Sequence, residues 1–238
     1  MGTDLTDRSL APPGIDQFAL FEGWVAEHAT PSAVLLDVGA GDGDQPYPTN
    51  LAPYVARIVG VDPDEGILRN ERVDERVHAP FEAFAADHAG EFDLAVAVYV
   101  VEHIADPAPF VAALHRCLRP GGSAFLLTPN RWHYFGATAL AAQRLHLDEL
   151  LLHRLRDEDT LHDHHFPIQY RLNSARAIRR VAGDAGFRAV ELRMIDEPGI
   201  YQPYFPARLR ALPVWYSQLI HRRRWPGAAG TILARLER

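Results

Sequence analysis

A glycine-rich turn that directly follows an apolar run restricts the fold of this chain more than any other feature. Residues 33–38 read Ala-Val-Leu-Leu-Asp-Val, and residues 39–43 read Gly-Ala-Gly-Asp-Gly. A short, continuous apolar run is typical of a strand that is buried on both faces of a parallel sheet. Glycines accept positive φ angles and let a ligand lie against bare backbone. The pattern therefore predicts a ligand site at the carboxyl end of a buried strand, with a helix that opens after the turn.

Strand-like apolar runs alternate with helical patterns along the first 130 residues. The pair Asp106-Pro107 predicts the start of one helix, with the aspartate as its N-cap. Strands that alternate with helices form parallel sheets with right-handed crossovers. The strands expected in this way are 33–38, 57–61, 76–78, 92–98 and 123–128, and the helices are 15–28, 49–56 and 107–118.

The second half of the chain is expected to complete the same sheet. Residues 174–185 have the pattern of an amphipathic helix, and 187–195 and 231–236 read as two strands of a closing hairpin. The predicted fold class is α/β: a Rossmann-like three-layer sandwich around a seven-stranded, mostly parallel sheet with one antiparallel edge strand.

We expect a single domain over residues 1–238, with its ligand-binding core in residues 30–130. Two segments remain: residues 131–172 read as helices with loops, and residues 198–227 are rich in proline and aromatic residues. Together with the N-terminal helix, they are predicted to form a lid over the carboxyl end of the sheet.

Composition excludes several kinds of chemistry and of partner. The chain has no lysine, which excludes lysine Schiff bases and phosphate-binding P-loops. Cys117 is the only cysteine, so an intramolecular disulfide and a cysteine-based zinc site are excluded. The balance of 31 acidic and 24 basic residues gives a net charge of −7, which argues against a nucleic-acid partner. A polar start and the lack of an apolar run of about 18 residues predict a cytoplasmic protein without integral membrane association.

The glycine-rich turn is acidic, and this bears on the ligand that it can hold. Asp37, Asp42 and Asp44 crowd it, and Asp44 stands where a dinucleotide-binding G-x-G-x-x-G motif has its last glycine. Three carboxylates repel a pyrophosphate and suit a ligand that carries ammonium and sulfonium groups. Asp62 ends the next apolar run, where a carboxylate can accept both hydroxyls of a ribose. Alternatively, Asp62 caps a helix that begins at Pro63.

Several motifs in a fixed order carry a resemblance to a known family. The chain resembles the class I S-adenosylmethionine-dependent methyltransferases over about residues 33–130, and S-adenosylmethionine has both an ammonium and a sulfonium group. The resemblance is specific for the fold and the cofactor and does not indicate the acceptor. It implies S-adenosylhomocysteine as the product formed from the cofactor. After the glycine-rich turn, the matching motifs are Phe92-Asp93-Leu94, Val101-Glu102-His103-Ile104, Asp106-Pro107, Arg119-Pro120-Gly121-Gly122 and Thr128-Pro129-Asn130.

The resemblance implies roles for individual residues around the cofactor. Asp62 would hold the ribose with Pro63 beside it, and Tyr99 would lie near the methyl-bearing sulfur. Adenine would lie near Phe81 and Glu82, although many members carry an acidic residue where this chain has a proline. The residues implied around the methionine end are Asp37, Gly39, Ala40, Gly41 and Gly43.

Histidines and polar residues after the later strands are candidates for catalysis and acceptor binding. His133 and His103 are the candidate general bases, because histidine titrates near neutral pH. Alternatively, His103 and Glu102 simply bond to neighbouring backbone. Related quinone O-methyltransferases hold a metal with a Glu-x-x-Glu-His arrangement, but here Tyr99 takes the first glutamate position, so no metal site is predicted. The acceptor-binding candidates are Asn130, Tyr134, His165, Tyr170 and Arg171.

Two further clusters leave alternatives open. His162, His164 and His165 fit a metal site, an acceptor pocket or a solvated loop. The run of arginines at 222–224 fits a solvated helix end, or a contact with an anion or a membrane surface.

The expected function is methyl transfer from S-adenosylmethionine to a small-molecule acceptor. An O-methyltransferase that acts on a sugar, a glycolipid precursor or a secondary metabolite is the preferred interpretation. The alternatives are an N-methyltransferase for a small amine, a non-catalytic cofactor-binding partner subunit and, disfavoured by the acidic turn, an NAD-dependent oxidoreductase. The sequence does not indicate the oligomeric state.

Overall fold

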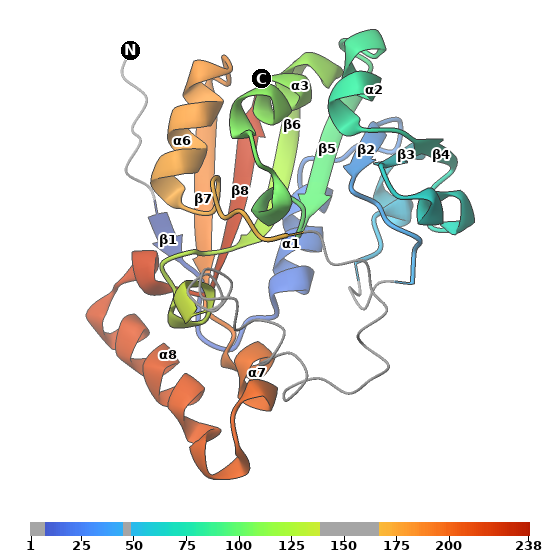
Figure 1. Cartoon of the computed structure of the whole chain (residues 1–238). Helices are drawn as coiled ribbons and strands as arrows, with labels where there is room; N and C mark the ends of the chain where they lie inside the picture. Colours follow the sequence, from blue (N-terminus) through green and yellow to red (C-terminus); the bar gives the residue numbers. More distant parts are fainter. Residues whose placement is uncertain (1–7, 45–48, 139–166) are drawn as a thin grey trace.

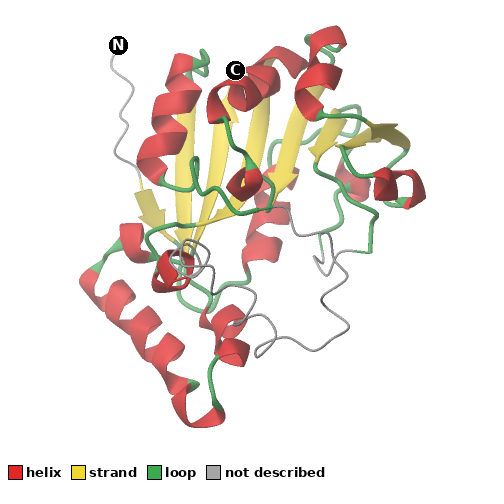
Figure 2. Cartoon of the chain, viewed as in Figure 1, coloured by secondary structure: helices red, strands yellow, loops and turns green. Residues whose placement is uncertain are grey.

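A mixed β-sheet with helices on both faces forms the body of the protein (Figures 1 and 2). The computed structural model describes residues 8–44, 49–138 and 167–238. The sheet has eight strands in the order β1-β7-β8-β6-β5-β2-β3-β4, and β8 runs antiparallel to both of its neighbours while all other pairs are parallel. The strands are β1 (Arg8–Leu10), β2 (Val34–Val38), β3 (Arg57–Asp62), β4 (Glu75–His78), β5 (Phe92–Val98), β6 (Leu118–Pro129), β7 (Ala189–Ile195) and β8 (Thr231–Glu237).

The predicted α/β class is confirmed, and two details of the predicted sheet are wrong. The sheet has eight strands, not seven, because β1 pairs with β7 at the edge. The antiparallel strand β8 is not an edge strand, because it lies between β6 and β7. Its side chains explain this position: Ile232 and Ala234 are buried in the core on one face of the sheet, and Leu233 is buried on the other. A strand that is apolar on both sides is stable inside a sheet and costly at its edge.

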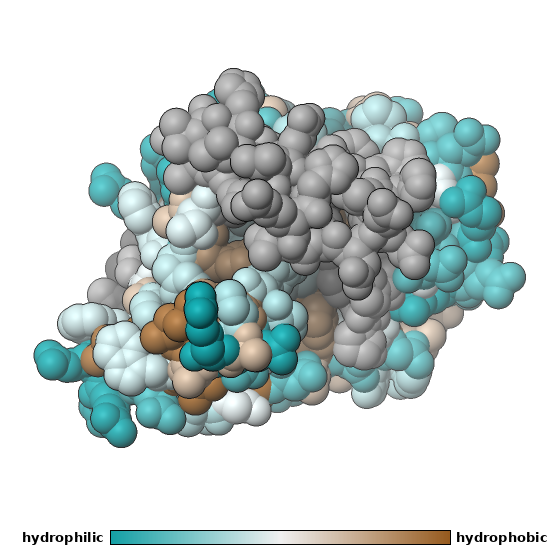
Figure 3. All heavy atoms as spheres, turned by 60° about the horizontal axis from the view of Figure 1, so that its bottom comes forward, coloured by the Kyte–Doolittle hydropathy of each residue, from teal (hydrophilic) through white to brown (hydrophobic). Residues whose placement is uncertain are grey.

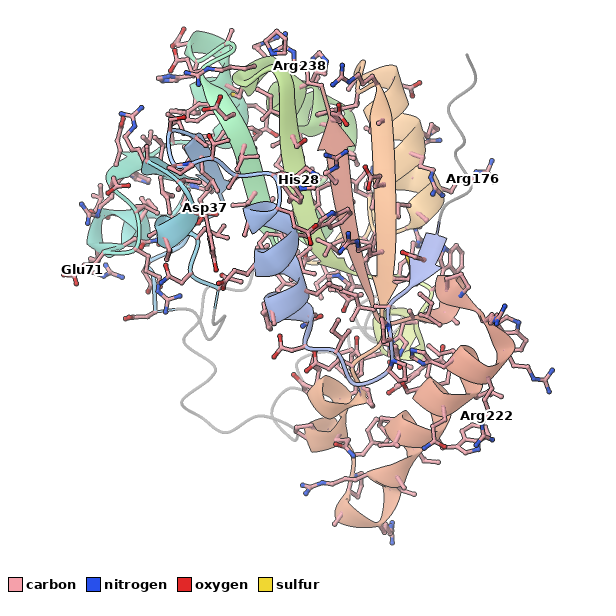
Figure 4. All side chains as sticks on the ribbon, turned by 180° about the vertical axis from the view of Figure 1, so that it is seen from behind. His28, Asp37, Glu71, Arg176, Arg222 and Arg238 are labelled. Carbon is pink, nitrogen blue, oxygen red and sulfur yellow. The ribbon has the colours of Figure 1, made fainter. Side chains whose placement is uncertain are left out.

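Helices cover the two faces unequally. On one face, α1 buries Phe21, Trp24 and Val25 against the sheet, and the Trp24 ring lies 5.7 Å from the ring of Phe125. Figure 4 shows α1 crossing this face, with His28 just past its C-terminal end. The α-helices are α1 (Gln17–Ala26), α2 (Phe81–Asp87), α3 (Pro107–Cys117), α6 (Ala175–Asp184), α7 (Pro198–Tyr201) and α8 (Ala211–Arg223), and α2, α3 and α6 pack on the opposite face.

The carboxyl ends of the parallel strands face α7 and α8, at the bottom of Figure 1. This agrees with a lid function for residues 198–227, which stays a prediction. The helix α1 was expected in that lid and instead covers a face of the sheet. Part of the predicted lid, residues 139–166, lies outside the described residues. Among the helices described, none has the length and apolar character to cross a membrane.

The helix expected after the glycine-rich turn does not form in the described part of this segment. Between residues 39 and 56, the helical structure described is the single 3-10 turn η1 (Ala52–Tyr54). Proline stands at positions 46, 48 and 53 of this stretch. A proline lacks the N–H that a helix interior requires and disfavours helical geometry at the preceding residue. The remaining 3-10 turns are η2 (Glu65–Arg69), η3 (Val101–His103), η5 (Gln202–Tyr204), η6 (Ala207–Leu209) and η7 (Pro226–Ala228).

A buried polar network joins three segments at the carboxyl end of the sheet. The Thr128 hydroxyl donates to the Glu102 carboxylate at 3.1 Å and accepts from the Asn173 amide at 2.6 Å. The same amide donates to the Pro129 carbonyl at 3.1 Å, and the Glu102 carbonyl accepts from the Tyr170 N–H at 3.1 Å. The network thereby ties η3, the end of β6 and the segment before α6 to one another.

Asn173→Ala should lower the free energy of unfolding by about 2 kcal/mol, because the buried Thr128 hydroxyl and the partly buried Pro129 carbonyl each lose the hydrogen bond that the Asn173 amide donates. Urea denaturation measures this loss. The exposed amide of Gln218 provides the control, since Gln218→Ala should change stability by less than about 0.5 kcal/mol. Equal midpoints for the two variants would contradict a stabilising role for the network.

Candidate functional site

The glycine-rich turn and the end of β3 meet through backbone hydrogen bonds. The Gly39 N–H donates to the Val61 carbonyl at 2.8 Å, and the Gly41 N–H donates to one carboxylate oxygen of Asp62 at 2.9 Å. The other oxygen of Asp62 accepts from the Asp64 N–H at 2.7 Å. Gly39 has φ +73°, and a Cβ at that position would overlap the side chain of Val100. The turn therefore requires glycine both for its backbone conformation and for the approach of the chain after β5.

Asn70 holds the turn from the side and was missed by the sequence analysis. Its side-chain amide donates to the carbonyls of Ala40 at 2.9 Å and Gly41 at 3.1 Å. A Cβ on Gly43 would lie 2.7 Å from the Asn70 side-chain oxygen, so this glycine makes room for the contact. Asn70 is only 2% exposed. An isolated asparagine outside any motif gives no sequence signal for such a role.

A cavity of about 400 Å³ opens beside the turn. This volume lies in the range of small-molecule sites, about 300–1,000 Å³. Its lining continues along residues 49–52, where the expected helix is replaced by the start of the 3-10 turn η1. The predicted cofactor residues Asp37, Gly39, Ala40 and Gly43 line the cavity, together with Asn70 and apolar side chains that include Phe21, Leu35, Val96 and Val98.

The charged side chains in the lining of the cavity are Asp37, Glu71 and Arg72, and the Asp62 carboxylate lies near Asp37 without being part of the lining. Burial, with a smaller contribution from the negative charge of Asp62, raises the pKa of Asp37 to about 7. Asp62 itself is only 7% exposed. A ligand with a positive charge stabilises such a pair, whereas a pyrophosphate is repelled by it. The residues present therefore fit a cationic nucleoside better than a dinucleotide.

The residues predicted around adenine follow β3 and β4. The Ala79 N–H donates to the Asp62 carbonyl at 3.0 Å, which places the start of α2 next to the end of β3. The Phe81 side chain is buried in the core with its ring 5.4 Å from that of Phe110. Glu82 is exposed, and the Pro63 carbonyl lies 3.0 Å from a ring nitrogen of His78. A ligand can therefore meet Phe81 through its backbone, not through its ring.

Tyr99 lies where β5 ends, between the turn and α1. Its backbone has φ +55°, an uncommon conformation for a tyrosine, and its N–H donates to the Leu127 carbonyl at 2.8 Å. The Tyr99 hydroxyl accepts from the Gln17 side-chain amide at 2.6 Å. Gln17 is 1% exposed, and it is a second residue that the sequence analysis missed. This contact fixes the tyrosine ring at the carboxyl edge of the sheet.

His133 is buried in an aromatic cluster beyond β6, with 1% of its surface exposed. Its ring lies 4.1 Å from Tyr134, 4.6 Å from Tyr201 and 5.3 Å from Tyr216. Nε2 is 3.5 Å from a carboxylate oxygen of Asp196, and Nδ1 accepts from the Phe135 N–H at 3.4 Å. Burial lowers the pKa of His133 to about 4, so the ring is neutral at physiological pH.

His103 has a different environment. It lies in η3, is partly exposed, and its Nδ1 is 3.4 Å from the Pro167 carbonyl. The adjacent Glu102 is 6% exposed, and burial raises its pKa to about 7. Glu102 belongs to the Thr128–Asn173 network, in agreement with a structural role for this part of the motif.

The acceptor-binding candidates are divided between structural and exposed positions. The Asn130 side-chain amide donates to the carbonyls of Gly227 at 2.9 Å and Ala229 at 2.8 Å, so it holds the segment before β8. Tyr170 is buried, and Arg171 is exposed. The hydroxyl of Tyr134 is buried without a hydrogen-bond partner among the described residues. His165, together with His162 and His164, lies outside the described residues.

Metal ligands are not gathered in the described part of the chain. No group of three or more histidine, cysteine, aspartate or glutamate side chains is placed there to hold a metal ion.

Comparisons with known proteins can be set against this geometry. A family model described as "Methyltransferase domain" matches residues 15–192. Ubiquinone biosynthesis O-methyltransferases are similar over part of the chain: the protein from Aromatoleum aromaticum is 40% identical over 106 residues, which are 41% of this chain and 44% of that protein. The protein from Thiobacillus denitrificans is 37% identical over 107 residues, with the same coverage. The matches thus span about half the length of these curated relatives or less.

Two solved structures share the fold over most of the chain. A SAM-dependent methyltransferase from Archaeoglobus fulgidus has a TM-score of 0.55 at 13% identity and covers 93% of this chain and 92% of its own. A possible histamine N-methyltransferase from Thermotoga maritima has a TM-score of 0.55 at 14% identity and covers 93% of this chain and 89% of its own. Since the family model covers most of the chain, and the strand order, the glycine-rich turn and Asp62 agree with it, the chain belongs to the class I S-adenosylmethionine-dependent methyltransferase superfamily.

Proposed function

We propose that this chain is an O-methyltransferase that uses S-adenosylmethionine to methylate a hydroxyl group of a small molecule. One observation carries the proposal: the glycine-rich turn, held to Asp62 by the Gly41 N–H, borders a cavity whose lining includes a second acidic side chain, Asp37. Family membership supports the cofactor, and the names of the partial relatives support oxygen as the methylated atom.

The residues of the turn have separate tasks in this proposal. Asp62 and Asp37 supply negative charge to a cationic nucleoside, with Asp62 toward the ribose. The glycines offer bare backbone, and Asn70 keeps their carbonyls in place. Bound S-adenosylmethionine supplies an electrophilic methyl group, and the protein contributes mainly by positioning the acceptor and excluding water. Tyr99, anchored by Gln17, closes the edge of the sheet beside the turn.

The acceptor is proposed to enter between the ends of β5 and β6 and residues 198–227. Among the acceptor-binding candidates that the structure describes, Tyr134 and Arg171 are preferred. Their side chains take no part in the polar contacts of the fold that are described above. A sugar, a glycolipid precursor or a secondary metabolite fits this proposal, and the names of the partial relatives add an intermediate of ubiquinone biosynthesis.

Calorimetric titration with S-adenosylmethionine, S-adenosylhomocysteine and NAD tests the cofactor assignment. Binding of the first two without NAD supports it. Methyl transfer to a panel of catechols, sugars and small amines then tests the reaction. If only amines are methylated, the chain is an N-methyltransferase and not an O-methyltransferase. If the cofactor binds but no acceptor is methylated, a non-catalytic partner subunit is favoured. Binding of NAD alone would overturn the proposal.

The affinity for S-adenosylmethionine should fall by about tenfold between pH 8 and pH 6, because a carboxyl with a pKa of about 7 must lose its proton to meet a cation. Asp37→Asn should bind more weakly at pH 8 and lose this pH dependence. The exposed Asp184 is a matched control, and Asp184→Asn should keep the wild-type profile. A pH-independent affinity in the wild type would contradict the role given to Asp37.

The same variant should not be less stable than the wild type at pH 8. A carboxyl group whose pKa is raised on folding lowers the free energy of unfolding at high pH, because the unfolded state ionises more easily. For Asp37 this loss begins near the pKa of the unfolded carboxyl, about 3.9, and reaches its full value above pH 7. Asp37→Asn removes it. Thermal denaturation at pH 8 therefore separates weaker cofactor binding from misfolding.

We propose His103, in preference to His133, as the general base for a weakly acidic hydroxyl, because it is partly exposed while His133 is buried with a pKa of about 4. His103→Gln should lower kcat roughly 10²- to 10⁴-fold, and much less for an acidic phenol that needs no base. His88→Gln, at a partly exposed histidine on another loop, should leave kcat unchanged. If the loss of kcat depends on the acidity of the acceptor in His133→Gln and not in His103→Gln, the general base is His133.

A further inference from the structure

Basic residues are concentrated at one end of an acidic protein. The chain has a net charge of −7, yet residues 198–230 contain five arginines and no aspartate or glutamate. None of these arginines has a carboxylate partner in the part of the chain that the structure describes. The segment is therefore a positively charged surface on a molecule whose average charge is negative. The five are Arg208, Arg210, Arg222, Arg223 and Arg224.

Large apolar side chains are exposed on the same segment. Trp215 is 61% exposed, Trp225 51%, Leu212 46% and Leu209 39%. Most large apolar side chains in the described part of the chain are buried, so the accumulation of exposed ones on one segment calls for an explanation.

The periodicity of α8 shows that the exposed residues share one side of the helix. Its inward side buries Pro213, Ser217 and Ile220, which follow one another at intervals of four and three residues. On the outward side of α8, Leu212 and Trp215 are three residues apart, and the exposed Arg222 lies seven residues after Trp215; the exposed Arg208 lies in the turn η6, just before the helix begins. Residues with these spacings lie along one side of a helix, so arginines flank an apolar centre.

The surface around Trp215 is hollowed. A groove of about 520 Å³ lies between α8 and the preceding turns. Beyond the helix, the guanidinium of Arg223 lies 5.9 Å from the centre of the Trp225 ring. Figure 3 shows this end of the molecule, with apolar and hydrophilic residues side by side on the face next to the grey segment. The groove is lined by Gln202, Arg210, Ala211, Val214, Trp215 and Gln218.

We propose that the α8 surface, formed by the outward side chains of residues 208–225, docks on an anionic lipid bilayer. Arginines on the polar side of an interfacial helix contact lipid phosphates, while tryptophan and leucine enter the boundary between headgroups and acyl chains. A nucleic acid would use the same charges but would leave the apolar centre in water. The combination of cationic rim and apolar centre therefore favours a lipid surface, and it does not depend on the identity of the methyl acceptor.

Vesicle flotation with the full chain tests this proposal. The protein should bind vesicles of phosphatidylcholine mixed with phosphatidylglycerol, bind phosphatidylcholine alone far more weakly, and dissociate as salt is added. Arg222→Gln combined with Arg223→Gln should weaken binding roughly 10- to 30-fold, from the contribution of each arginine near an anionic surface. Arg176→Gln combined with Arg180→Gln on α6 removes the same charge elsewhere and should leave binding unchanged; Figure 4 shows Arg176 and Arg222 on these two separate helices.

A second pair of variants tests the apolar centre. Trp215→Ala should weaken vesicle binding about tenfold, because a large interfacial side chain is lost. Trp132, which is 68% exposed outside α8, is the control, and Trp132→Ala should bind as the wild type does. Sedimentation velocity of the same proteins detects the rival occupant, a second copy of the chain. The proposal is overturned if anionic vesicles are not bound, if the control pairs weaken binding equally, or if Trp215→Ala only converts a dimer into a monomer.

Discussion

One hydrogen bond, from the Gly41 N–H to the carboxylate of Asp62, organises the site on which the rest of the structure converges. It joins the turn after β2 to the end of β3, and it leaves both partners at the carboxyl edge of the sheet. A charge-assisted hydrogen bond of this kind is stronger than one between neutral groups. The bond also fixes the Asp62 carboxylate near Asp37, whose pKa is raised first by burial and then by the charge of Asp62. The same carboxylate thus takes part both in the geometry of the turn and in the electrostatics beside it.

The alternation of apolar runs and helical patterns predicted most of the sheet, and the exceptions have physical reasons. Residues 92–98 were predicted with the bounds that β5 has, because a buried parallel strand is apolar throughout. The three residues of β1 are too few to form a pattern, and their pairing with β7 depends on tertiary contacts. The interior position of β8 could not be read from its sequence, because apolar runs do not reveal which strands become neighbours. The helix expected over 49–56 failed because local proline geometry prevailed over spacing.

The candidate site was predictable where the chain itself brings residues together and not where distant segments meet. The turn and Asp62 follow consecutive parallel strands, and the carboxyl ends of such strands lie at one edge. Asn70, Gln17 and Asp196 contact the site from segments that no motif links to it. His133 shows what a motif leaves out: a histidine beside a motif suggests catalysis, and the fold adds that this one is buried among three aromatic rings with a lowered pKa, while its catalytic role stays a prediction. Burial is a property of the assembled fold, and a linear pattern does not contain it.

The position of β8 also determines the order in which the sheet can be assembled during synthesis. On a ribosome, the strands from β2 to β6 emerge early and can pair with one another, but β7 has no bond to any of them. Within the described sheet, it is linked to that half by strand pairing only through β8, which is made after it. Until then, β6 and β7 both present an open edge, and such edges invite pairing with foreign strands. A nascent chain of this architecture therefore has two halves of a sheet that await a common central strand from the synthesis of β7 until that of β8.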